Sequence, residues 1–478
     1  MAGLFVTDAA APAQVAPARP NHRRRVGPLG VRARSDRRVR VVSAMSLWAA
    51  LLLVTYWWDA DGGIRDLAGW ASTLTSTGRL TGLWSAQLLL AQVLLMARLP
   101  VLENAYGRDR LTRIHRIVGF TSFTLMVAHI VLIIGGYASA QWSAVLGTSW
   151  DLLTDYGGVL LAAAGTICLI MVVVTSLRAA RRRLRYESWH LLHLYAYLGV
   201  GLALPHQLWT GQEFLQSRGA TVYWWTIWAA TAAAVLVWRI GLPVARSLSH
   251  GLRVTSVVPE APGVVSVYLT GRWLARLPLE AGQFLNVRFL SGAGWTRANP
   301  YSISAAPDGH SIRITAKVVG DGSRRLLGLR PGTRLIFEGP YGRLGDRARD
   351  RHRVLLMGAG VGITPLRALA EGLDYRPGEA VVLQRFSDRP LFAAEFDVLR
   401  RERGLQVIFL PGRRTSARSV LGPAAGNSEL AALRHWVPDL AEREVFLCGP
   451  DPWTNAAVGL CRAAGVPEDR IHTERFGW

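Results

Sequence analysis

Long runs of apolar residues, separated by short polar segments, dominate the first half of this chain. Each run is close to the about 20 residues that a helix needs to cross a bilayer. The six runs cover residues 41–58, 80–98, 115–137, 157–177, 189–209 and 221–242. The pattern predicts an all-α bundle of six transmembrane helices over residues 41–245.

From about residue 250 the pattern changes to short alternating runs that are broken by Gly and Pro. Such runs predict an antiparallel β-barrel over residues 250–345. After residue 350, apolar strands alternate with amphipathic helical stretches, which predicts a doubly wound α/β domain over residues 350–478. The expected fold class is therefore a multi-domain membrane protein with two soluble domains after the helical bundle.

Composition agrees with this division. The chain has 478 residues, which is too long for one ordinary core, and its 18 tryptophans fit a multi-span membrane domain. Residues 1–40 are rich in Ala, Pro and Arg and have no apolar run next to the amino terminus, so we expect a disordered basic arm rather than a cleaved signal peptide. Cys168, Cys448 and Cys461 are too few and too scattered for a disulfide framework or an iron–sulfur cluster.

Basic residues flank the six runs unevenly. Segments 1–40, 98–116 and 178–185 contain nine, five and five arginines, whereas the loops on the other side contain only three. Cytoplasmic loops carry the excess of Lys and Arg, so both termini are expected in the cytoplasm and the protein in the cell membrane. These flanks, together with attraction to anionic lipid, explain most of the formal net charge of +22. No nucleic-acid reader motif accompanies the charge, so we expect no nucleic-acid partner. The sequence leaves the oligomeric state open.

Five of the eleven histidines lie inside the apolar runs, where an ionisable residue is costly unless it has a function. His115 and His129 are 14 residues apart, which on an α-helix places both imidazoles on one face, about 21 Å apart along the axis. His193 and His206 repeat this arrangement in a later run. Paired imidazoles from facing helices are what a bis-histidine haem iron needs on its two axial sides. The spacing therefore predicts two stacked haems.

Other interpretations of these histidines stay open at this point. Each could be a hydrogen-bonded helix-packing residue, although four at matched spacings are hard to explain in this way. A zinc site needs ligands within one turn or loop, and these pairs are too far apart along the helix. His190 could replace His193, because neither 13 nor 16 residues before His206 gives an ideal same-face match. A bend at Pro205 could realign the faces.

A Gly-rich loop follows the apolar strand VLLM and opens a helix near Pro365. Its residues are Gly358, Ala359, Gly360, Val361 and Gly362. Glycines let the backbone approach a pyrophosphate, and the helix N-terminus supplies aligned N–H groups. A tight connection without a ligand is the alternative, but the strand–loop–helix context favours nucleotide binding.

The end of the strand VVLQRFS indicates which nucleotide is bound. Arg385, Ser387 and Arg389 stand where an acidic residue would bind a ribose 2′-hydroxyl. Arginines suit a 2′-phosphate, so NADPH is expected in preference to NADH.

Six motifs occur in order along the chain: NPYSIS (299–304), GDGS (320–323), GPYG (339–342), GAGVGITP (358–365), CGP (448–450) and the tail ERFGW. With them, the soluble half resembles the ferredoxin–NADP reductase family. From about residue 78 onward the chain resembles the ferric reductase and NADPH oxidase superfamily, in which that module is fused to a six-helix haem domain. The resemblance implies two b-type haems held by His115, His129, His193 and His206, and it favours His193 over His190. Together with the orientation, it pairs His115 with His193 on the inner side and His129 with His206 on the outer side.

The same resemblance implies roles for residues of the soluble half. Residues expected to bind FAD are Asn299, Pro300, Tyr301, Ser302, Gly320, Gly322 and Ser323. Residues expected to bind NADPH or NADH are Gly358, Ala359, Gly360, Val361, Gly362, Thr364, Arg385, Ser387, Cys448, Gly449 and Pro450. Ser302, Cys448 and Glu474 are expected around the nicotinamide during hydride transfer, and Phe476 is expected to cover the flavin until nicotinamide displaces it. Core packing is the alternative for Cys448 and Phe476, and Trp478 is a second candidate for the stacking position.

Two departures from the family pattern affect what can be expected. The family often has arginine two residues before the tyrosine, where this chain has Asn299, and the nearest arginine is Arg297. The resemblance therefore leaves open which residue binds the pyrophosphate. In addition, Ile133 occupies the position four after the outer ligand that is often histidine in eukaryotic oxidases, although Arg79 supplies a basic residue on the outer side.

These observations predict a transmembrane NAD(P)H-dependent oxidoreductase. Flavin must stand between nicotinamide and haem, because nicotinamide gives two electrons while each haem accepts one. Electrons would pass to an extracytoplasmic small molecule. Ile133 favours a ferric chelate, while oxygen giving superoxide is an alternative. A membrane carrier that reduces a quinone or a partner protein is a further alternative, which the short outer loops disfavour.

Overall fold

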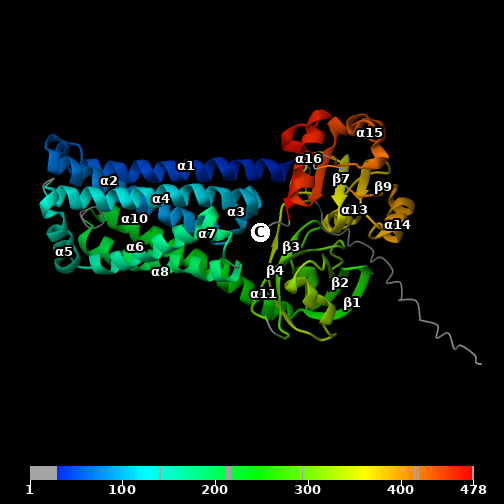
Figure 1. The fold of residues 1–478 in the computed structure, drawn as a ribbon, viewed down its shortest axis with the longest axis horizontal. Helices are drawn as coiled ribbons and strands as arrows, with labels where there is room; N and C mark the ends of the chain where they lie inside the picture. The colour runs from blue at the N-terminus through cyan, green and yellow to red at the C-terminus, as the bar shows by residue number, and fades with distance from the viewer. Residues whose placement is uncertain are drawn as a thin grey trace, which may run out of the picture. The chain divides into compact units, whose positions relative to one another are not determined.

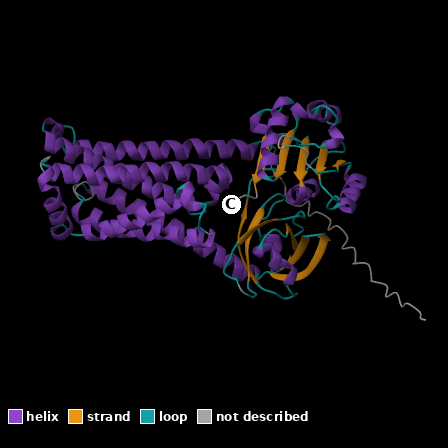
Figure 2. Ribbon diagram, viewed as in Figure 1, coloured by secondary structure: helices purple, strands orange, loops and turns teal. Residues whose placement is uncertain are grey.

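The structure is a computed structural model, and it describes residues 30–138, 141–184, 186–211, 217–292, 294–413, 416 and 419–475. The chain divides into two compact units, one over Val31–Leu248 and one that begins at Ser249. The first unit is helical, and the second contains the strands (Figures 1 and 2).

The helical unit consists of long helices with short ones between them. The long helices are α1 (Val31–Ala60), α2 (Trp70–Met96), α4 (Arg108–Tyr137), α6 (Val159–Ser176), α8 (Tyr186–Thr210) and α10 (Arg218–Ala234). The short helices are α3 (Pro100–Tyr106), α5 (Val145–Asp155), α7 (Arg178–Arg181) and α11 (Leu242–His250). A π-helical turn over Val235–Gly241 joins α10 to α11.

Within the described residues, five helices are long and apolar enough to cross a membrane. They are α1, α2, α4, α6 and the continuous helix Arg218–His250. Helix α8 covers the expected span 189–209 and has 25 residues, but it is more polar because it carries three histidines. Large apolar side chains such as Trp48 and Ile167 are 65% and 68% exposed. An exterior with many such side chains is typical of a surface that contacts lipid.

Helices α1, α2 and α4 begin well before the apolar runs that predict them, at Val31, Trp70 and Arg108 rather than at residues 41, 80 and 115. Helix α1 begins at Val31, so the last part of the expected disordered arm is helical. Arginine is a good helix former, and extending an existing helix adds one hydrogen bond per residue. Helix α2 begins at Trp70 and takes in a polar stretch, because hydroxyls such as that of Thr77 bond to carbonyls of their own helix. Arg79 therefore lies inside α2 rather than at its start.

The strands that follow Ser249 form two three-stranded antiparallel sheets and a parallel sheet. One antiparallel sheet has the order β1–β2–β5, from Arg253–Ala261, Val264–Thr270 and Ser311–Lys317. The other has the order β4–β3–β6, from Asn299–Ser302, Phe284–Phe289 and Leu335–Tyr341. Isolated antiparallel bridges at Arg253–Arg334 and Ile303–Ile314 join the two sheets. Inward residues of both, such as Val267 and Leu285, share one core.

The last part of the chain is an α/β layer structure. Its strands are β7 (Val354–Ala359), β8 (Ala380–Arg385), β9 (Gln406–Leu410), β10 (Glu444–Gly449) and β11 (Ile471–Arg475), all parallel, in the order β11–β10–β7–β8–β9. Its helices are α13 (Ile363–Gly372), α14 (Ala393–Arg403), α15 (Glu429–Trp436) and α16 (Asp451–Ala463). Separate cores, one with α13 and α14 and one with α15 and α16, cover the two faces of the sheet.

The order of these strands reverses between β7 and β10. The chain runs outward from β7 through β8 to β9 and then returns to the other side of β7 as β10. Ligands of doubly wound sheets bind at such a reversal, beyond the carboxyl ends of the strands. The doubly wound domain predicted from the sequence is confirmed, and the carboxyl ends of β7 and β10 carry its GAGVG and CGP motifs.

Candidate functional site

The four histidines expected to bind haem meet in two pairs within the helical unit. The ring centroids of His115 on α4 and His193 on α8 are 6.1 Å apart. Those of His129 and His206 on the same two helices are 6.3 Å apart. The pairs are those expected from the sequence, and His193 rather than His190 faces His115.

Helix α2 orients both histidines of α4. The Nδ1 atom of His115 lies 3.2 Å from the carbonyl oxygen of Gln92, and that of His129 lies 2.8 Å from the carbonyl oxygen of Gly78. A carbonyl only accepts, so each Nδ1 carries the proton and donates it. The two acceptors are 14 residues apart, like the two histidines. Consequently, Nε2 is the nitrogen of each ring left with a lone pair.

For the histidines of α8, hydroxyl groups rather than backbone carbonyls bond to the Nδ1 atoms. The Nδ1 atom of His193 lies 3.2 Å from Ser176 Oγ of α6, and that of His206 lies 2.7 Å from Thr210 Oγ1. Thr210 Oγ1 also donates to the carbonyl oxygen of His206 at 2.7 Å, which commits its only proton. The hydroxyl must therefore accept the proton of His206 Nδ1, and Nε2 of His206 keeps its lone pair.

Glycines allow the helices to approach closely at these levels. A Cβ added at Gly82 of α2 would lie 2.6 Å from His129 Nδ1. Between α6 and α8, a Cβ at Gly165 would lie 2.7 Å from the carbonyl oxygen of Gly199, and one at Gly199 would lie 2.9 Å from that of Gly165. Small residues at such contacts are what close helix packing in membranes requires.

Arg79 and Ile133 both lie beside the helix turn that holds His129. Arg79 follows Gly78 and forms ion pairs with Asp61 and, at 3.6 Å, with Asp66. A Cβ added at Gly78 would lie 3.0 Å from Cδ1 of Ile133. The basic residue expected on the outer side is therefore paired with carboxylates, and an apolar side chain packs next to it.

The flavin-type motifs come together at the edge of β4. Tyr301 and Ser302 are buried, at 7% and 5% exposed, and burial raises the pKa of Tyr301 to about 12. A Cβ added at Gly322 would lie 3.0 Å from Asn299 Oδ1, so NPYSIS and GDGS adjoin. Ser323 Oγ accepts the N–H of Gly320 at 3.2 Å, which shapes the GDGS loop from within.

Sequence reasoning missed Arg325, two residues after GDGS. Its guanidinium donates to the carbonyl oxygens of Ser291 and Gly294, both at 2.5 Å. Its charge lowers the pKa of Tyr301, although burial has the larger, raising effect. The position of Arg325 directly after GDGS could have indicated a residue near the expected flavin motifs. Arg325 is thus a cation close to β4, in a chain that has Asn299 where the family often has arginine.

The nucleotide-type loop packs directly against the CGP motif. A Cβ at Gly362 would overlap the carbonyl group of Cys448, and Thr364 Oγ1 donates to the carbonyl oxygen of Val361 at 2.9 Å. Gly449 meets the Trp453 ring, which a Cβ would approach to 2.7 Å. Pro450 lies just before α16. Glycines are therefore required at 362 and 449 because other parts of the protein pack against them.

The neighbouring strands β7, β10 and β11 place one candidate residue each at the same level of the sheet. Cys448 on β10 pairs with Gly358 on β7 and with Glu474 on β11. Cys448 is fully buried, and that burial, followed by the charge of Glu474, raises the pKa of its thiol. The thiol is therefore neutral at physiological pH. Strand β11 has no alternating pattern of its own and was not predicted; Phe476 and Trp478 lie outside the described residues.

Arg385 has a different environment from the one predicted. It is 7% exposed, and its Nη1 atom donates to the carbonyl oxygens of Leu410, at 3.1 Å, and of Gly412. Burial lowers its pKa. Its guanidinium thus anchors the loop after β9. Ser387 and Arg389 are exposed at the end of β8.

Comparisons with known proteins cover both units. Residues 81–204 match the family model described as "Ferric reductase like transmembrane component", a stretch that contains three of the four paired histidines. The C-terminal part matches flavin reductases. It is 27% identical over 237 residues to an NADPH oxidoreductase of Mycobacterium tuberculosis, covering 47% of this chain and 59% of that protein.

Two further relatives are more similar in sequence. The ferredoxin reductase component of the 3-ketosteroid-9-alpha-monooxygenase of Mycolicibacterium smegmatis is 32% identical over 235 residues, 47% of this chain and 65% of that protein. Ferredoxin–NADP reductase B of Sorangium cellulosum is 31% identical over 217 residues, 41% of this chain and 85% of that protein. The chain spans about three fifths of the length of the first two relatives.

Proposed function

We propose that this chain, as a member of the ferric reductase and NADPH oxidase superfamily, is a transmembrane oxidoreductase. In this proposal, electrons move from cytoplasmic NADPH through FAD and two b-type haems to a ferric chelate on the other side of the membrane. The observation that carries it is the presence of two histidine pairs in one chain with flavin and nucleotide motifs.

The separation of the paired rings supports haem binding. Metal–nitrogen bonds of about 2 Å, with each ring nitrogen about 1 Å from its ring centre, put the centroids of an axial pair about 6 Å apart. The observed centroid separations are 6.1 and 6.3 Å. Because Nδ1 of each ring is held, Nε2 is the nitrogen that would bind iron, and held imidazoles are stronger ligands.

The domains proposed here follow the two units. Residues 41–245 form the haem domain, with α8 as the sixth span because it carries His193 and His206. We interpret the two bridged antiparallel sheets as the closed barrel of an FAD domain over 250–345, and residues 350–478 as the NAD(P)H domain. The arginine-rich flanks support a cytoplasmic position for both termini. His115 and His193 are then the inner ligands.

Residues of the soluble unit would prepare hydride transfer. Tyr301 would pack on the flavin ring and Ser302 would lie near its N5 atom, while Glu474 and Cys448 would contact the nicotinamide. The neutral Cys448 thiol offers an uncharged contact. Bound flavin supplies the conversion between a two-electron hydride donor and one-electron acceptors. The GAGVG loop and the start of α13 would hold the pyrophosphate with backbone N–H groups.

The outer surface supports a ferric chelate more than oxygen as acceptor. Ile133 packs beside Gly78, next to the outer histidine, where a second histidine would offer a proton donor for reduced oxygen. Arg79 is already paired with Asp61 and Asp66. Superoxide formation is the second candidate function. It is favoured by the presence of a basic residue, Arg79, on the outer side, although carboxylates pair with that residue.

Reduction of ferric citrate by NADPH tests the proposal and separates its alternatives. We expect the purified protein in lipid vesicles to reduce ferric citrate equally well without oxygen and with superoxide dismutase. Loss of reduction under either condition would make superoxide the product. Haem analysis of the same sample should return two haems per chain, and one or none would contradict the proposal.

A further inference from the structure

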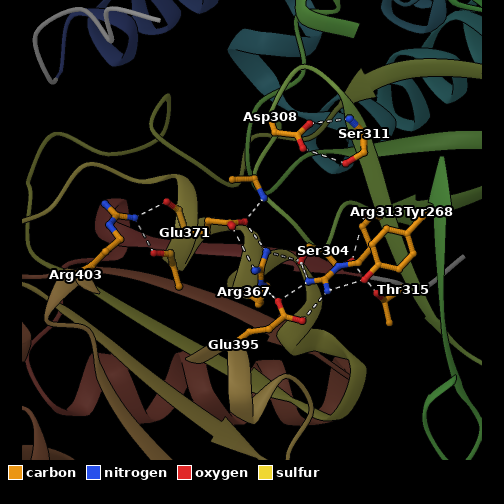
Figure 3. A network of polar contacts seen from close by, with 12 residues as sticks. Tyr268, Ser304, Asp308, Ser311, Arg313, Thr315, Arg367, Glu371, Glu395 and Arg403 are labelled. Carbon is orange, nitrogen blue, oxygen red and sulfur yellow. Dashed lines mark hydrogen bonds and ion pairs between the residues drawn. The ribbon is translucent and has the colours of Figure 1, made fainter. Parts of the chain in front are cut away.

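A polar cluster joins the segment after β4 to helices α13 and α14 (Figure 3). Strand β4 carries Tyr301 and Ser302, the residues proposed to contact flavin, and is called the flavin strand below. Arg313 of β5 donates from Nη1 and Nη2 to Glu395 Oε1 and Oε2 of α14, at 2.7 and 2.9 Å. The same guanidinium donates from Nε to Ser304 Oγ at 3.0 Å and from Nη2 to Ser304 O at 2.6 Å. Arg313 therefore clamps the chain, two residues after Ser302, onto α14.

Arg367 makes a second clamp from α13. Its Nη1 atom donates to Ser304 O at 3.2 Å and to Glu371 Oε2 at 2.5 Å, and its Nε atom lies 2.5 Å from Glu395 Oε2. Glu371 Oε2 also accepts the N–H of Ala306 at 2.6 Å. The backbone that directly follows β4 is thus bonded to charged groups of α13, and Arg313 links it to Glu395 of α14.

The cluster is buried and its charges balance. The side chains of Arg313, Arg367 and Glu371 are 6%, 3% and 5% exposed, and that of Glu395 is 26% exposed. Burial raises the pKa of Glu395, but bonds from Arg313 and the charge of Arg367 outweigh burial and hold this pKa below its usual range. Glu395 is therefore a carboxylate held between the two arginines. These four residues are called the Arg–Glu cluster below.

Stability alone does not account for such an arrangement. Replacing a buried ion cluster by well-packed apolar residues is often neutral or stabilising, because charges are costly to remove from water. Bidentate arginine–carboxylate pairs, in contrast, fix direction as well as distance. The Arg–Glu cluster therefore determines geometry more than stability.

We propose that the Arg–Glu cluster is a positioning device that sets the distance and angle between the flavin strand and the nucleotide loop for hydride transfer. This inference rests on the proposed function. Strand β4 ends at Ser302, and α13 begins directly after Gly362. Reacting atoms must approach to about 3–3.5 Å, and a misplacement of about 1 Å costs roughly 100-fold in rate. The four residues act through the backbone, so they are positioning rather than catalytic residues.

The substitution Glu395→Gln tests this role in the full-length, FAD-loaded protein. It keeps the size of the side chain but removes the charge shared by the two arginines. In anaerobic stopped-flow experiments at saturating NADPH, we expect flavin reduction to slow by about tenfold or more. Long-wavelength charge-transfer absorbance of nicotinamide on flavin should weaken as well. FAD content and the Kd for NADP+ should stay within about twofold, because neither site loses a contact.

The same helix offers a matched control. Asp397 forms an exposed ion pair with Arg400 at 3.2 Å, with side chains 51% and 62% exposed. Asp397→Asn removes one carboxylate charge from α14 without touching the cluster, and it should leave rate, absorbance and affinity unchanged. Glu395→Asp restores the charge and should recover part of the rate.

Three results would overturn the inference. The first is flavin reduction at the wild-type rate in Glu395→Gln. The second is a slower rate that comes with an equal loss of FAD and of thermal stability, which indicates a merely structural role. The third is an FAD-loaded wild-type protein that NADPH does not reduce, which overturns the proposed function together with the inference, whereas the first two leave the proposed function intact.

Discussion

The four paired histidines differ in the group that holds their Nδ1 atoms. For His115 and His129 the partner is a backbone carbonyl, which no substitution can remove. For His193 and His206 it is a hydroxyl from Ser176 or Thr210. Groups that accept the Nδ1 proton fix the tautomer of the imidazole and make Nε2 a stronger ligand. The effect of these groups can therefore be measured by substitution only for the histidines of α8.

The substitution Thr210→Val should weaken haem binding at the outer site by about 10- to 100-fold, because His206 loses its acceptor. The inner site should be unaffected. Haem titration of the purified protein, followed by absorbance, measures this. Thr166→Val is the control, since Thr166 Oγ1 bonds only to Ala162 O of its own helix, at 2.9 Å. Equal haem affinity in both variants would contradict the assigned role.

At the nucleotide end, Arg389 and Arg385 should behave differently on substitution. Arg389 is exposed, with one bond to the carbonyl oxygen of Glu260 at 3.2 Å, whereas Arg385 anchors a loop. NADPH should be preferred over NADH in the wild type. Arg389→Ala should lower kcat/KM for NADPH by roughly tenfold, the cost of about one charge-assisted contact, and leave that for NADH unchanged. Arg385→Ala should lower thermal stability instead. Equal kcat/KM values for NADPH and NADH in the wild type would contradict the predicted preference for NADPH.

At the scale of elements, close contact between helices positions the histidines of α8. Gly165 and Gly199 bring the backbones of α6 and α8 together, and Ser176 of α6 then reaches His193. The distance between two helices thus decides whether a hydroxyl meets an imidazole. A side chain at this contact must separate the helices, because the obstructing atoms are backbone.

The neighbouring glycine Gly201 makes this testable. Gly199→Ala places a methyl group 2.9 Å from the carbonyl oxygen of Gly165, whereas a Cβ at Gly201 has nothing within 4 Å. We expect Gly199→Ala to lower the thermal unfolding temperature and the haem content. Gly201→Ala should be neutral or slightly stabilising, by about 0.5–1 kcal/mol, because Ala is the better helix former. Similar unfolding temperatures for the two variants would mean that the contact is not needed.

At the scale of the whole molecule, the two histidine pairs should act in series. His206→Ala should remove about half of the haem by losing the outer site, stop the reduction of ferric citrate and leave reduction of FAD by NADPH intact, because the first step is confined to the soluble unit. Stopped-flow spectra separate the flavin and haem steps. His190→Ala is the control and should keep both haems. Loss of a haem in His190→Ala would assign the inner ligand to His190.

The sequence by itself determined the features that repeat along one element. Spacing of 14 residues placed His115 and His129 on one face of a helix, and short apolar runs such as VLLM and VVLQRFS predicted strands where β7 and β8 lie. The GAGVG loop was recognised because its glycines, strand and helix are adjacent in the chain. These predictions depend on the geometry of a single helix, strand or turn, which neighbouring residues encode.

The tertiary structure alone decided which groups meet across elements. Arg385 looked like a phosphate ligand from its place at a strand end, but carbonyls 25 and 27 residues later bind it. The clamp between Arg313 and Glu395 joins residues 82 apart, and the carbonyl that holds His129 is 51 residues away. No repeating pattern in the sequence predicts such contacts. They arise only when helices and sheets pack and each buried charge or N–H must find a partner.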